Sequence, residues 1–498
     1  MSKTEIKKII VNSKKEVIHK IVREILVLFQ INTADEIVDI YDFDSLEISN
    51  SIVDGSCLSV TTSILLKNDK LSKNMEKTSL ADIDENPRAA VNRLIKWNLY
   101  YLFTEVFGKT TAPWGILHGV RPTKIVHRYI ERGLHKSEII RKLIDNYAVV
   151  REKALLLADI AYRQLPIMAT TDQSTISIYI GIPFCLSRCL YCSFPSNILP
   201  DNNTLKIFMD TLYQEIVSIK KIIEQYKLKV QAIYIGGGTP TSLPEEEFYN
   251  LLCAVNNLKT RETIEFTVEA GRPDSITAAK ITAMEQFKVT RISVNPQTMQ
   301  EKTLQVIGRK HTPADIITVY NKIRAVSRAK INMDLILGLP GESVEDVRDT
   351  LNKVTALNPD DITVHALAIK KGSYLKLHQS DINLPSDPVV CQMAEITQLI
   401  LQKNSYIPYY LYRQGYMSGQ LENIGYCKKD AASIYNIQIM SERQTILGIG
   451  GNASTKIVAP SGTYLKTLFN PKDLKTYLEN ADKYIRKRAS LMEEVYGK

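Results

Sequence analysis

The 498-residue sequence has few cysteines and no long apolar run. Seven cysteines, an odd and sparse number, exclude a disulfide-stabilised scaffold and leave thiols for metal or redox chemistry. The apolar runs are short, as at residues 25–29, whereas a membrane-spanning helix needs about 18 or more apolar residues. Residues 1–8 carry charges but are followed by no apolar segment or cleavage site. We therefore expect a cytoplasmic protein without a membrane span.

The overall composition is that of a folded protein with several domains. With 44% hydrophobic and 23% charged residues, the chain is not largely disordered, collagenous or coiled-coil, and its length suggests roughly two to four domains. The net charge of +9 suits an anionic substrate as well as RNA. The sequence has no compact basic stretch interleaved with aromatic residues, so we expect no nucleic-acid partner.

Six short β-branched runs alternate with segments of helical length from about residue 170 onward. This alternation predicts βαβ units and a parallel sheet, and the continuous apolar character of the runs indicates strands that are covered on both faces. The fold class is therefore α/β, with six units that form an open sheet or a partial (β/α) barrel. The runs are residues 176–180, 230–235, 264–268, 289–294, 331–337 and 362–367, and the helical segments include 203–226, 245–255, 275–286 and 344–356.

The residues before this core have a different pattern, which predicts an N-terminal α+β domain of unknown role over residues 1–170. A turn at residues 113–115 marks a structured loop, and we interpret the polar residues beside it, His118, Arg121 and Lys124, as structural groups. The expected elements are a helix at 15–29, strand-like alternation over 36–66, and helices near 92–107 and 138–165.

The core is expected over residues 171–380, and residues 381–498 form a C-terminal α+β extension. In this extension, residues 448–452 predict a tight glycine turn after an apolar run. Residues 483–498 predict a charged helix with a solvated surface.

Three of the seven cysteines, Cys185, Cys189 and Cys192, follow the first strand of the core with the spacing C-x3-C-x2-C. A structural zinc site needs a fourth ligand, but no histidine lies between His135 and His311. Three thiolates suit a [4Fe-4S] cluster in which one iron has no protein ligand. That iron is free to bind a substrate or a cofactor.

The loop GIPFCLSRCLYC over residues 181–192 resembles the signature of radical S-adenosylmethionine (SAM) enzymes. In that family the open iron chelates the amino and carboxylate groups of SAM, and an electron from the cluster cleaves SAM to methionine and a 5′-deoxyadenosyl radical. The resemblance implies that the core is a radical SAM (β/α)6 barrel with a [4Fe-4S] cluster and SAM as cofactors. It also implies that Cys185, Cys189 and Cys192 are metal ligands and catalytic residues.

Glycine and polar residues at the ends of the later strands agree with this resemblance. Ligands of parallel sheets bind at the carboxyl ends of the strands, and consecutive glycines allow close approach of the backbone. Asp334, inside an apolar strand, needs a ribose hydroxyl, a cation or a structural ion pair as its partner. The cofactor-binding residues that the resemblance implies are Tyr179, Gly236, Gly237, Gly238, Thr239, Glu269, Gln297, Arg309 and Asp334.

Further segments resemble one group of radical SAM enzymes, the oxygen-independent coproporphyrinogen III oxidases. The long N-terminal extension looks most like the coproporphyrinogen dehydrogenase branch of Gram-positive bacteria. The segments are VEAGRPD at residues 268–274, VNPQT at 294–298, IGRKH at 307–311, DLILGLPG at 334–341 and LGIGGNA at 447–453.

This resemblance implies oxidative decarboxylation of two propionates of coproporphyrinogen III to vinyl groups, which gives protoporphyrinogen IX. It also implies an electron donor such as a flavodoxin or a ferredoxin. The carboxylates of the substrate need cations, although each candidate taken alone is more often a surface or structural residue. The candidates are Arg272, Lys310, His311, His365 and Lys370.

Two positions depart from the best-characterised oxidases. Phe194 stands where those enzymes have a further cysteine, and residues 452–454 read Asn-Ala-Ser where the group often has Gly-Ala-His. The Cys-Ser-Phe ending at residues 192–194 is more similar to the haem-chaperone branch. The alternatives are therefore a haem carrier, another radical SAM reaction on a tetrapyrrole and, from a different class, a tRNA-modifying enzyme.

Overall fold

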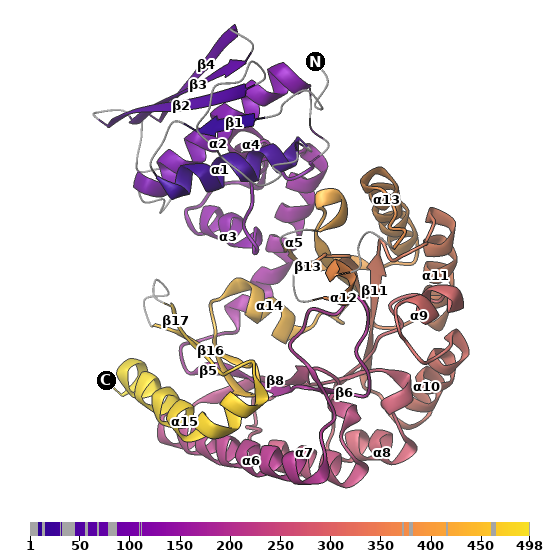
Figure 1. The fold of residues 1–498 in the computed structure, drawn as a ribbon. Coiled ribbons are helices and arrows are strands. Elements are labelled where there is room, and N and C mark those ends of the chain that lie inside the picture. Colours follow the sequence, from indigo (N-terminus) through magenta and orange to yellow (C-terminus); the bar gives the residue numbers. More distant parts are fainter. Residues whose placement is uncertain are drawn as a thin grey trace. The chain divides into compact units, whose positions relative to one another are not determined.

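The structure is a computed structural model, and the chain in it divides into two compact units, residues 1–159 and 160–498 (Figure 1). The predicted division into three domains, with boundaries at residues 170 and 380, stays a prediction. The described residues are 8–11, 15–29, 31, 45–54, 58–66, 69–77, 87–108, 110, 112–370, 373–377, 382–414, 417–459 and 465–497.

The first unit packs two helices, α1 (Glu16–Leu28) and α2 (Pro87–Phe107), around a shared apolar core with a four-stranded sheet. In α1, Ile18, Ile21, Val22 and Ile25 recur at helical spacing and are all buried, which confirms the predicted opening helix. The sheet order is β1-β2-β3-β4, with only β1 and β2 parallel. Its strands are β1 (Lys8–Val11), β2 (Ser45–Asp54), β3 (Leu58–Leu66) and β4 (Asp69–Lys77). Of the predicted alternation over 36–66, residues 36–44 lie outside the described residues.

The remainder of the first unit is helical, with α3 (Thr123–Glu131), α4 (Lys136–Tyr147) and the start of α5 (Arg151–Ala169). The helical segment predicted over 138–165 is in fact two helices, because Ala148 adopts a left-handed φ of 54° that ends α4.

The predicted loop around Trp114 is a packed turn. Trp114 is buried, and a Cβ at Gly115 would collide with the carbonyl oxygens of Tyr147 and Ala148. Nδ1 of His118 lies 2.9 Å from the carbonyl oxygen of Ile116, which fits a structural role.

The second unit contains the predicted α/β core. Six consecutive strands of its sheet are parallel, in the order β12-β11-β10-β9-β8-β5, and they coincide with the six predicted runs. These strands are β5 (Thr175–Ile182), β8 (Lys229–Gly237), β9 (Glu265–Gly271), β10 (Arg291–Val294), β11 (Lys330–Leu337) and β12 (Asp361–Ala366). Figure 1 shows an arc of helices outside them: α6 (Asn202–Gln225), α7 (Glu245–Asn256), α8 (Ala278–Gln286), α10 (Pro313–Val326) and α11 (Val344–Leu357).

Later residues extend this sheet at both edges. β15 runs parallel to β5, and β16 and β17 continue antiparallel beyond it, while β14 and β13 continue antiparallel beyond β12. The predicted glycine turn therefore lies beside the first strand of the core. The added strands are β13 (Ile407–Tyr412), β14 (Asn423–Cys427), β15 (Thr445–Gly450), β16 (Ser454–Val458) and β17 (Leu465–Phe469), and the helices among them are α13 (Asp387–Lys403) and α14 (Ile434–Ser441).

Buried charges meet at the amino ends of the parallel strands. Arg291, the first residue of β10, pairs with Asp361 at 2.8 Å and with Glu265 at 3.5 Å, which begin β12 and β9. Glu265 also accepts a hydrogen bond of 3.0 Å from the hydroxyl of Ser433, the N-cap of α14. This network ties α14 to three strands.

The C-terminal helix α15 (Leu474–Tyr496) begins earlier than predicted, and the prediction of a solvated helix holds for one side only. Arg488 is fully buried and pairs at 2.8 Å with Glu215 of α6, which is also fully buried. The charge pattern of the tail could not reveal this pair, because its two members are 273 residues apart in the sequence.

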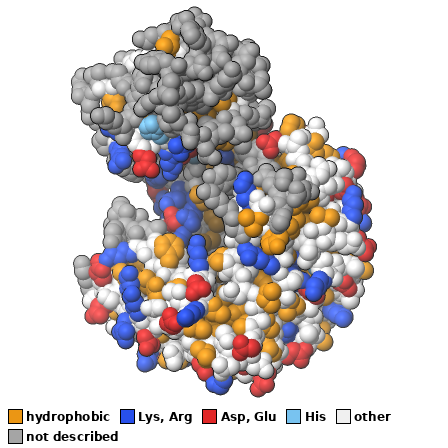
Figure 2. Space-filling model, in the orientation of Figure 1, with side chains coloured by type: hydrophobic (Ala, Val, Ile, Leu, Met, Phe, Trp, Pro, Cys, Tyr) orange, Lys and Arg blue, Asp and Glu red, His pale blue; other side chains and the backbone are white. Residues whose placement is uncertain are grey.

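Charged side chains of both signs are interspersed on the face of the second unit that Figure 2 shows. Within the described residues, no helix has the length and apolar character that crossing a membrane requires.

Replacing Arg291 is expected to destabilise the protein strongly. In Arg291→Met the carboxylates of Asp361 and Glu265 stay buried without their countercharge, so the free energy of unfolding should fall by about 3–5 kcal/mol. Urea denaturation followed by circular dichroism measures this loss. Arg261→Met, which removes an exposed guanidinium, is the control. An equal loss in both variants would show that the buried network contributes nothing particular.

Candidate functional site

The candidate site begins with the loop that carries the three cysteines after β5. Cys189 is buried, while Cys185 and Cys192 are partly exposed. The amide of Cys192 donates a 3.1 Å hydrogen bond to the carbonyl of Cys189, which forms a tight turn. Burial raises the pKa of Cys192, and the thiols of Cys189 and Cys185 raise it further, so the three sulfur atoms share one environment.

Hydrogen bonds from several elements hold this loop. The amide of Leu190 donates to the carbonyl of Ile307 at 3.0 Å. The guanidinium of Arg272, which is 3% exposed, donates to the hydroxyl of Ser187 at 2.7 Å while it pairs with Asp274 at 2.7 Å. Arg272 was a candidate for binding substrate carboxylates, but its contacts are those of a residue that positions the cysteine loop.

The glycine run after β8 packs directly on the entry to the cysteine loop. The amide of Thr239 donates to the carbonyl of Phe184 at 2.7 Å, and its hydroxyl lies 3.5 Å from the sulfur of Cys185. A Cβ at Gly238 would lie 2.9 Å from the backbone nitrogen of Phe184, closer than real Cβ atoms approach. Glycine is therefore required at Gly238 by the close approach of the two backbones.

Glu269, in β9, faces the same glycine run. It accepts hydrogen bonds from the hydroxyl of Tyr234 and, at 3.1 Å, from the amide of Gly237. Burial raises the pKa of Glu269 to about 7, and the nearby Asp334 contributes to the increase, whereas the bond from Tyr234 opposes it. A bound ammonium group would favour the charged carboxylate at this position.

A stack of tyrosine rings lies next to Glu269. Tyr234 stacks on Tyr435 with ring centroids 4.5 Å apart and on Tyr179 at 6.1 Å. The sequence interpretation included Tyr179 but missed the other two. Tyr234 could have been found, because it lies two residues before Gly236 on one face of a strand. Tyr435 comes from α14, and no local pattern connects it with the site.

Gln297 and Asp334 meet through their backbones. Gln297 has a φ of 66°, and its amide donates to the carbonyl of Asp334 at 2.9 Å. The carboxylate of Asp334 accepts a 2.8 Å bond from the side chain of Asn332 and lies 3.9 Å from Nε2 of His365. Asp334 therefore has partners within the protein, and its carboxylate is also 22% exposed.

Arg309 connects this side of the site with the cysteine loop. Its guanidinium donates to the hydroxyl of Tyr191 at 3.1 Å and to the carbonyl of Asn295 at 3.5 Å. Its Nε is buried and has no hydrogen-bond partner among the described residues. An unpaired donor of this kind suits an anionic ligand group.

The remaining candidate cations have different environments. Burial, together with the guanidinium of Arg309, lowers the pKa of His311 to about 4, so its ring is neutral at pH 7 and does not supply the expected cation. Lys310 is exposed. Lys370 is close enough to Cys192 for the two groups to affect each other electrostatically, and burial lowers its pKa. His365 lies between Asp334 and the hydroxyl of Tyr412, which is 3.3 Å from its Nδ1.

These residues fit the cofactors that the sequence predicts. Three thiols share one loop, the unpaired Nε of Arg309 is available to an anion, and Glu269 is available to an ammonium group. Among the described residues, no three His, Cys, Asp or Glu side chains form a site for a single metal ion. A cubane cluster takes one thiolate on each of several irons, so its ligands do not have to meet at one point. The roles of the nine predicted cofactor-binding residues stay predictions.

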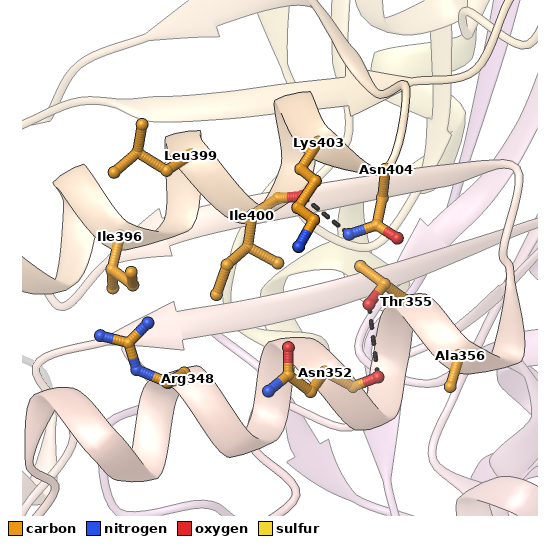
Figure 3. Close-up of a pocket in the computed structure, with 9 residues that line it drawn as sticks. All are labelled: Arg348, Asn352, Thr355, Ala356, Ile396, Leu399, Ile400, Lys403 and Asn404. Atoms are coloured by element: carbon orange, nitrogen blue, oxygen red, sulfur yellow. Dashed lines mark hydrogen bonds between the residues drawn. The ribbon is translucent and has the colours of Figure 1, made fainter.

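A pocket of about 570 Å³ lies elsewhere, between α11 and α13 (Figure 3). It contains none of the predicted site residues. Its lining consists of Arg348, Asn352, Thr355, Ala356, Ile396, Leu399, Ile400, Lys403 and Asn404.

Comparison with known proteins first defines the class. Residues 179–354 match the radical SAM superfamily, a span that contains the cysteine loop and the glycine run. The six parallel strands agree with this match, and proteins of this superfamily use a [4Fe-4S] cluster and SAM as cofactors. The chain is also 38% identical over 397 residues to the oxygen-independent coproporphyrinogen-III oxidase-like protein HemZ of Bacillus subtilis, with 78% of each chain covered. It therefore belongs to the oxygen-independent coproporphyrinogen III oxidase group of the radical SAM superfamily, as the motifs predicted.

Two further proteins are similar over shorter parts. The heme chaperone HemW of Bacillus subtilis is 29% identical over 281 residues, which is 56% of this chain and 70% of that protein. The solved structure of coproporphyrinogen III oxidase (HemN) from Escherichia coli has a TM-score of 0.50 and 22% identity, with 65% of this chain and 72% of that chain covered. At this identity the structural likeness shows a shared fold.

The raised pKa of Glu269 predicts a pH-dependent stability in the protein without cofactors. Because its folded pKa of about 7 exceeds the ordinary value of about 4.3, ionisation of Glu269 destabilises the folded state as the pH rises between these values. The free energy of unfolding of Glu269→Gln, compared with that of wild type, should therefore increase by about 1–3 kcal/mol from about pH 5 to about pH 8. Urea denaturation at both pH values measures it. A difference that is the same at both pH values would contradict the raised pKa.

Proposed function

We propose that this protein is a radical SAM oxidoreductase that decarboxylates two propionates of coproporphyrinogen III to vinyl groups, giving protoporphyrinogen IX without oxygen. The observation that carries the proposal is the meeting of the cysteine loop, the glycine run and Glu269 at the ends of the parallel strands. The similarity to an oxidase-like protein over 78% of the chain supports the choice of reaction.

In this proposal Cys185, Cys189 and Cys192 hold the cluster, and SAM lies along the strand ends. Glu269 pairs with the ammonium group of SAM, and Arg309 binds its carboxylate through the unpaired Nε. The glycine run gives the ligand access to the backbone, and Asp334 binds a ribose hydroxyl with its partly exposed carboxylate. When bound, the cluster and SAM would supply the one-electron chemistry that removes a hydrogen atom from the propionate carbon next to the pyrrole ring.

The residues of the chain have two tasks in the proposed reaction, which are to bind the carboxylates and to exclude water. Each propionate loses a hydrogen atom, which leaves in 5′-deoxyadenosine, together with carbon dioxide and one electron, which passes to an external acceptor. Cations that include His365 when protonated and Lys370 bind the carboxylates. The stacked rings of Tyr179, Tyr234 and Tyr435 provide an apolar wall that excludes water. A flavodoxin or a ferredoxin would supply the electron that the chemistry of the cluster requires.

A haem carrier is the second candidate function, and one position favours it. Phe194 replaces the further cysteine of the best-characterised oxidases, and its backbone amide bonds to the thiol of Cys192. The similarity to a heme chaperone over 56% of the chain points the same way. Such a carrier would use the tetrapyrrole site without decarboxylation.

Loss of any one cysteine of the loop should prevent cluster assembly. We expect Cys185→Ala, Cys189→Ala or Cys192→Ala to abolish the iron-sulfur absorption of the anaerobically reconstituted protein, because three thiolates already leave one iron open. Iron and sulfide analysis measures the loss. Cys253→Ala, which removes an exposed thiol of α7, is the matched control and should keep a full cluster. Reconstituted wild-type protein that contains zinc and no iron would refute the cluster assignment.

Product analysis distinguishes the oxidase from the carrier. Under strict anaerobiosis with SAM and a reductant, the oxidase should convert coproporphyrinogen III to the vinyl product, detected by chromatography and mass spectrometry. The tetramethyl ester should not bind, because each propionate then loses a charge-assisted contact worth about 1.5–3 kcal/mol. Reductive cleavage of SAM and tight binding of haem without a vinyl product would favour the carrier or another haem-modifying reaction.

A further inference from the structure

Glu215 and Arg488 form a buried ion pair behind the cysteine loop. We propose that this pair positions the loop for the cluster and SAM, by fixing the glycine turn at residues 450–451 against the residues that precede Cys185. The inference rests on the proposed assignment of the three cysteines as cluster ligands. It makes the C-terminal helix α15 part of the support of the site.

Glu215 binds the glycine turn directly. Its Oε2 accepts a 2.7 Å hydrogen bond from the amide of Gly450 and a 2.6 Å bond from the hydroxyl of Tyr477. Its Oε1 accepts a 2.8 Å bond from Arg488. The side-chain amide of Asn470 bridges Glu215, at 3.2 Å, and the carbonyl of Gly450, at 2.9 Å. One carboxylate thus joins α6, α15 and the end of β15.

The glycine turn in turn supports the entry to the cysteine loop. Gly450 has a φ of 84°, and a Cβ there would collide with the carbonyl oxygen of Gly181. A Cβ at Gly451 would lie 2.8 Å from Cγ of Pro183. The turn therefore packs tightly on Gly181 and Pro183, and Pro183 lies two positions before Cys185. A shift of the turn would be transmitted to the loop, because packed interiors leave no space to absorb it.

A second line of contacts connects the same pair with the loop through aromatic rings. Phe184, the neighbour of Cys185, packs edge-on against Phe208 of α6 with centroids 4.8 Å apart. Phe208 in turn lies 5.8 Å from Tyr477 of α15, which donates to Glu215. The network of Glu215 therefore contacts the residues before Cys185 on two sides, through the glycine turn and through Phe208 of α6.

The chain offers a matched pair for comparison, because it contains a second buried arginine network. Arg291 pairs with carboxylates at the amino ends of the strands, opposite to the cysteine loop, whereas Arg488 pairs behind the loop itself. Loss of either arginine leaves a buried carboxylate without its countercharge. Loss of Arg291 acts on α14 and its Tyr435, because the amide of Tyr435 donates to Glu265 at 2.9 Å. Of the two networks, only that of Arg488 contacts residues 181–184, so cluster assembly and SAM binding are the measurements that distinguish them.

The experiment compares Arg488→Met with Arg291→Met in the full-length protein, at a temperature where both are folded. Iron per chain after anaerobic reconstitution, the dissociation constant for SAM and the electron paramagnetic resonance spectrum of the reduced cluster with SAM are measured. We expect Arg488→Met to weaken SAM binding by about tenfold or more and to change the spectrum, because small misplacements are costly at such sites. Arg488→Lys, which keeps a cation beside Glu215, should recover part of the affinity. Arg291→Met should bind SAM within about twofold of wild type.

Equal SAM affinities and spectra in Arg488→Met and wild type would overturn the inference, as would an equal loss in Arg291→Met. If Arg488→Met does not fold, Tyr477→Phe removes one bond to Glu215 and keeps the ring. Tyr477→Phe should then weaken SAM binding with the iron content unchanged, and unchanged affinity would overturn the inference. A wild-type protein that assembles no cluster would instead refute the proposed function.

Discussion

The common direction of six strands is the constraint on which the rest of the structure depends. Because β5, β8, β9, β10, β11 and β12 are parallel, every loop that follows a strand emerges at the same edge of the sheet. Residues far apart in the sequence, such as Cys185 and Thr239, or Tyr191 and Arg309, therefore come into contact there. The crossover helices that parallel strands require cover the outside of the sheet and leave this edge for the site.

The buried carboxylates at the two ends of the parallel strands have different partners. At the amino ends, the guanidinium of Arg291 pairs with the carboxylates of Asp361 and Glu265, so that opposite charges meet within the protein. A raised carboxyl pKa occurs at both ends, because burial raises the pKa of Glu269 and that of Asp361 to about 7. Among the described residues, Nε of Arg309 and Nε of Arg291 both have no hydrogen-bond partner. The partners of the carboxylates differ between the two ends: a guanidinium faces Asp361 and Glu265, whereas a hydroxyl and a backbone amide donate to Glu269.

The sequence predicted the core well because its signals are local. Buried parallel strands appear as continuous apolar runs, and all six predicted runs are strands of the sheet. The failures share a different physical cause. The break between α4 and α5 depends on the left-handed backbone of Ala148, which no hydrophobic pattern reveals. Tyr435 reaches the tyrosine stack from α14, which the sequence places far from the strands that it contacts.

The sequence by itself determined the chemistry, because the spacing of Cys185, Cys189 and Cys192 and the glycine run are properties of short segments that need no partner to be recognised. Only the tertiary structure decided which charges serve the ligand and which serve the fold. Arg272 and Arg488 are indistinguishable from solvated arginines in the sequence, yet each is buried against a carboxylate, Asp274 and Glu215, respectively. The physical reason is that a buried charge loses its hydration and needs a partner of opposite charge, so the position of that partner decides what the charge stabilises. For Arg488 that partner lies 273 residues away, and only folding brings the two together.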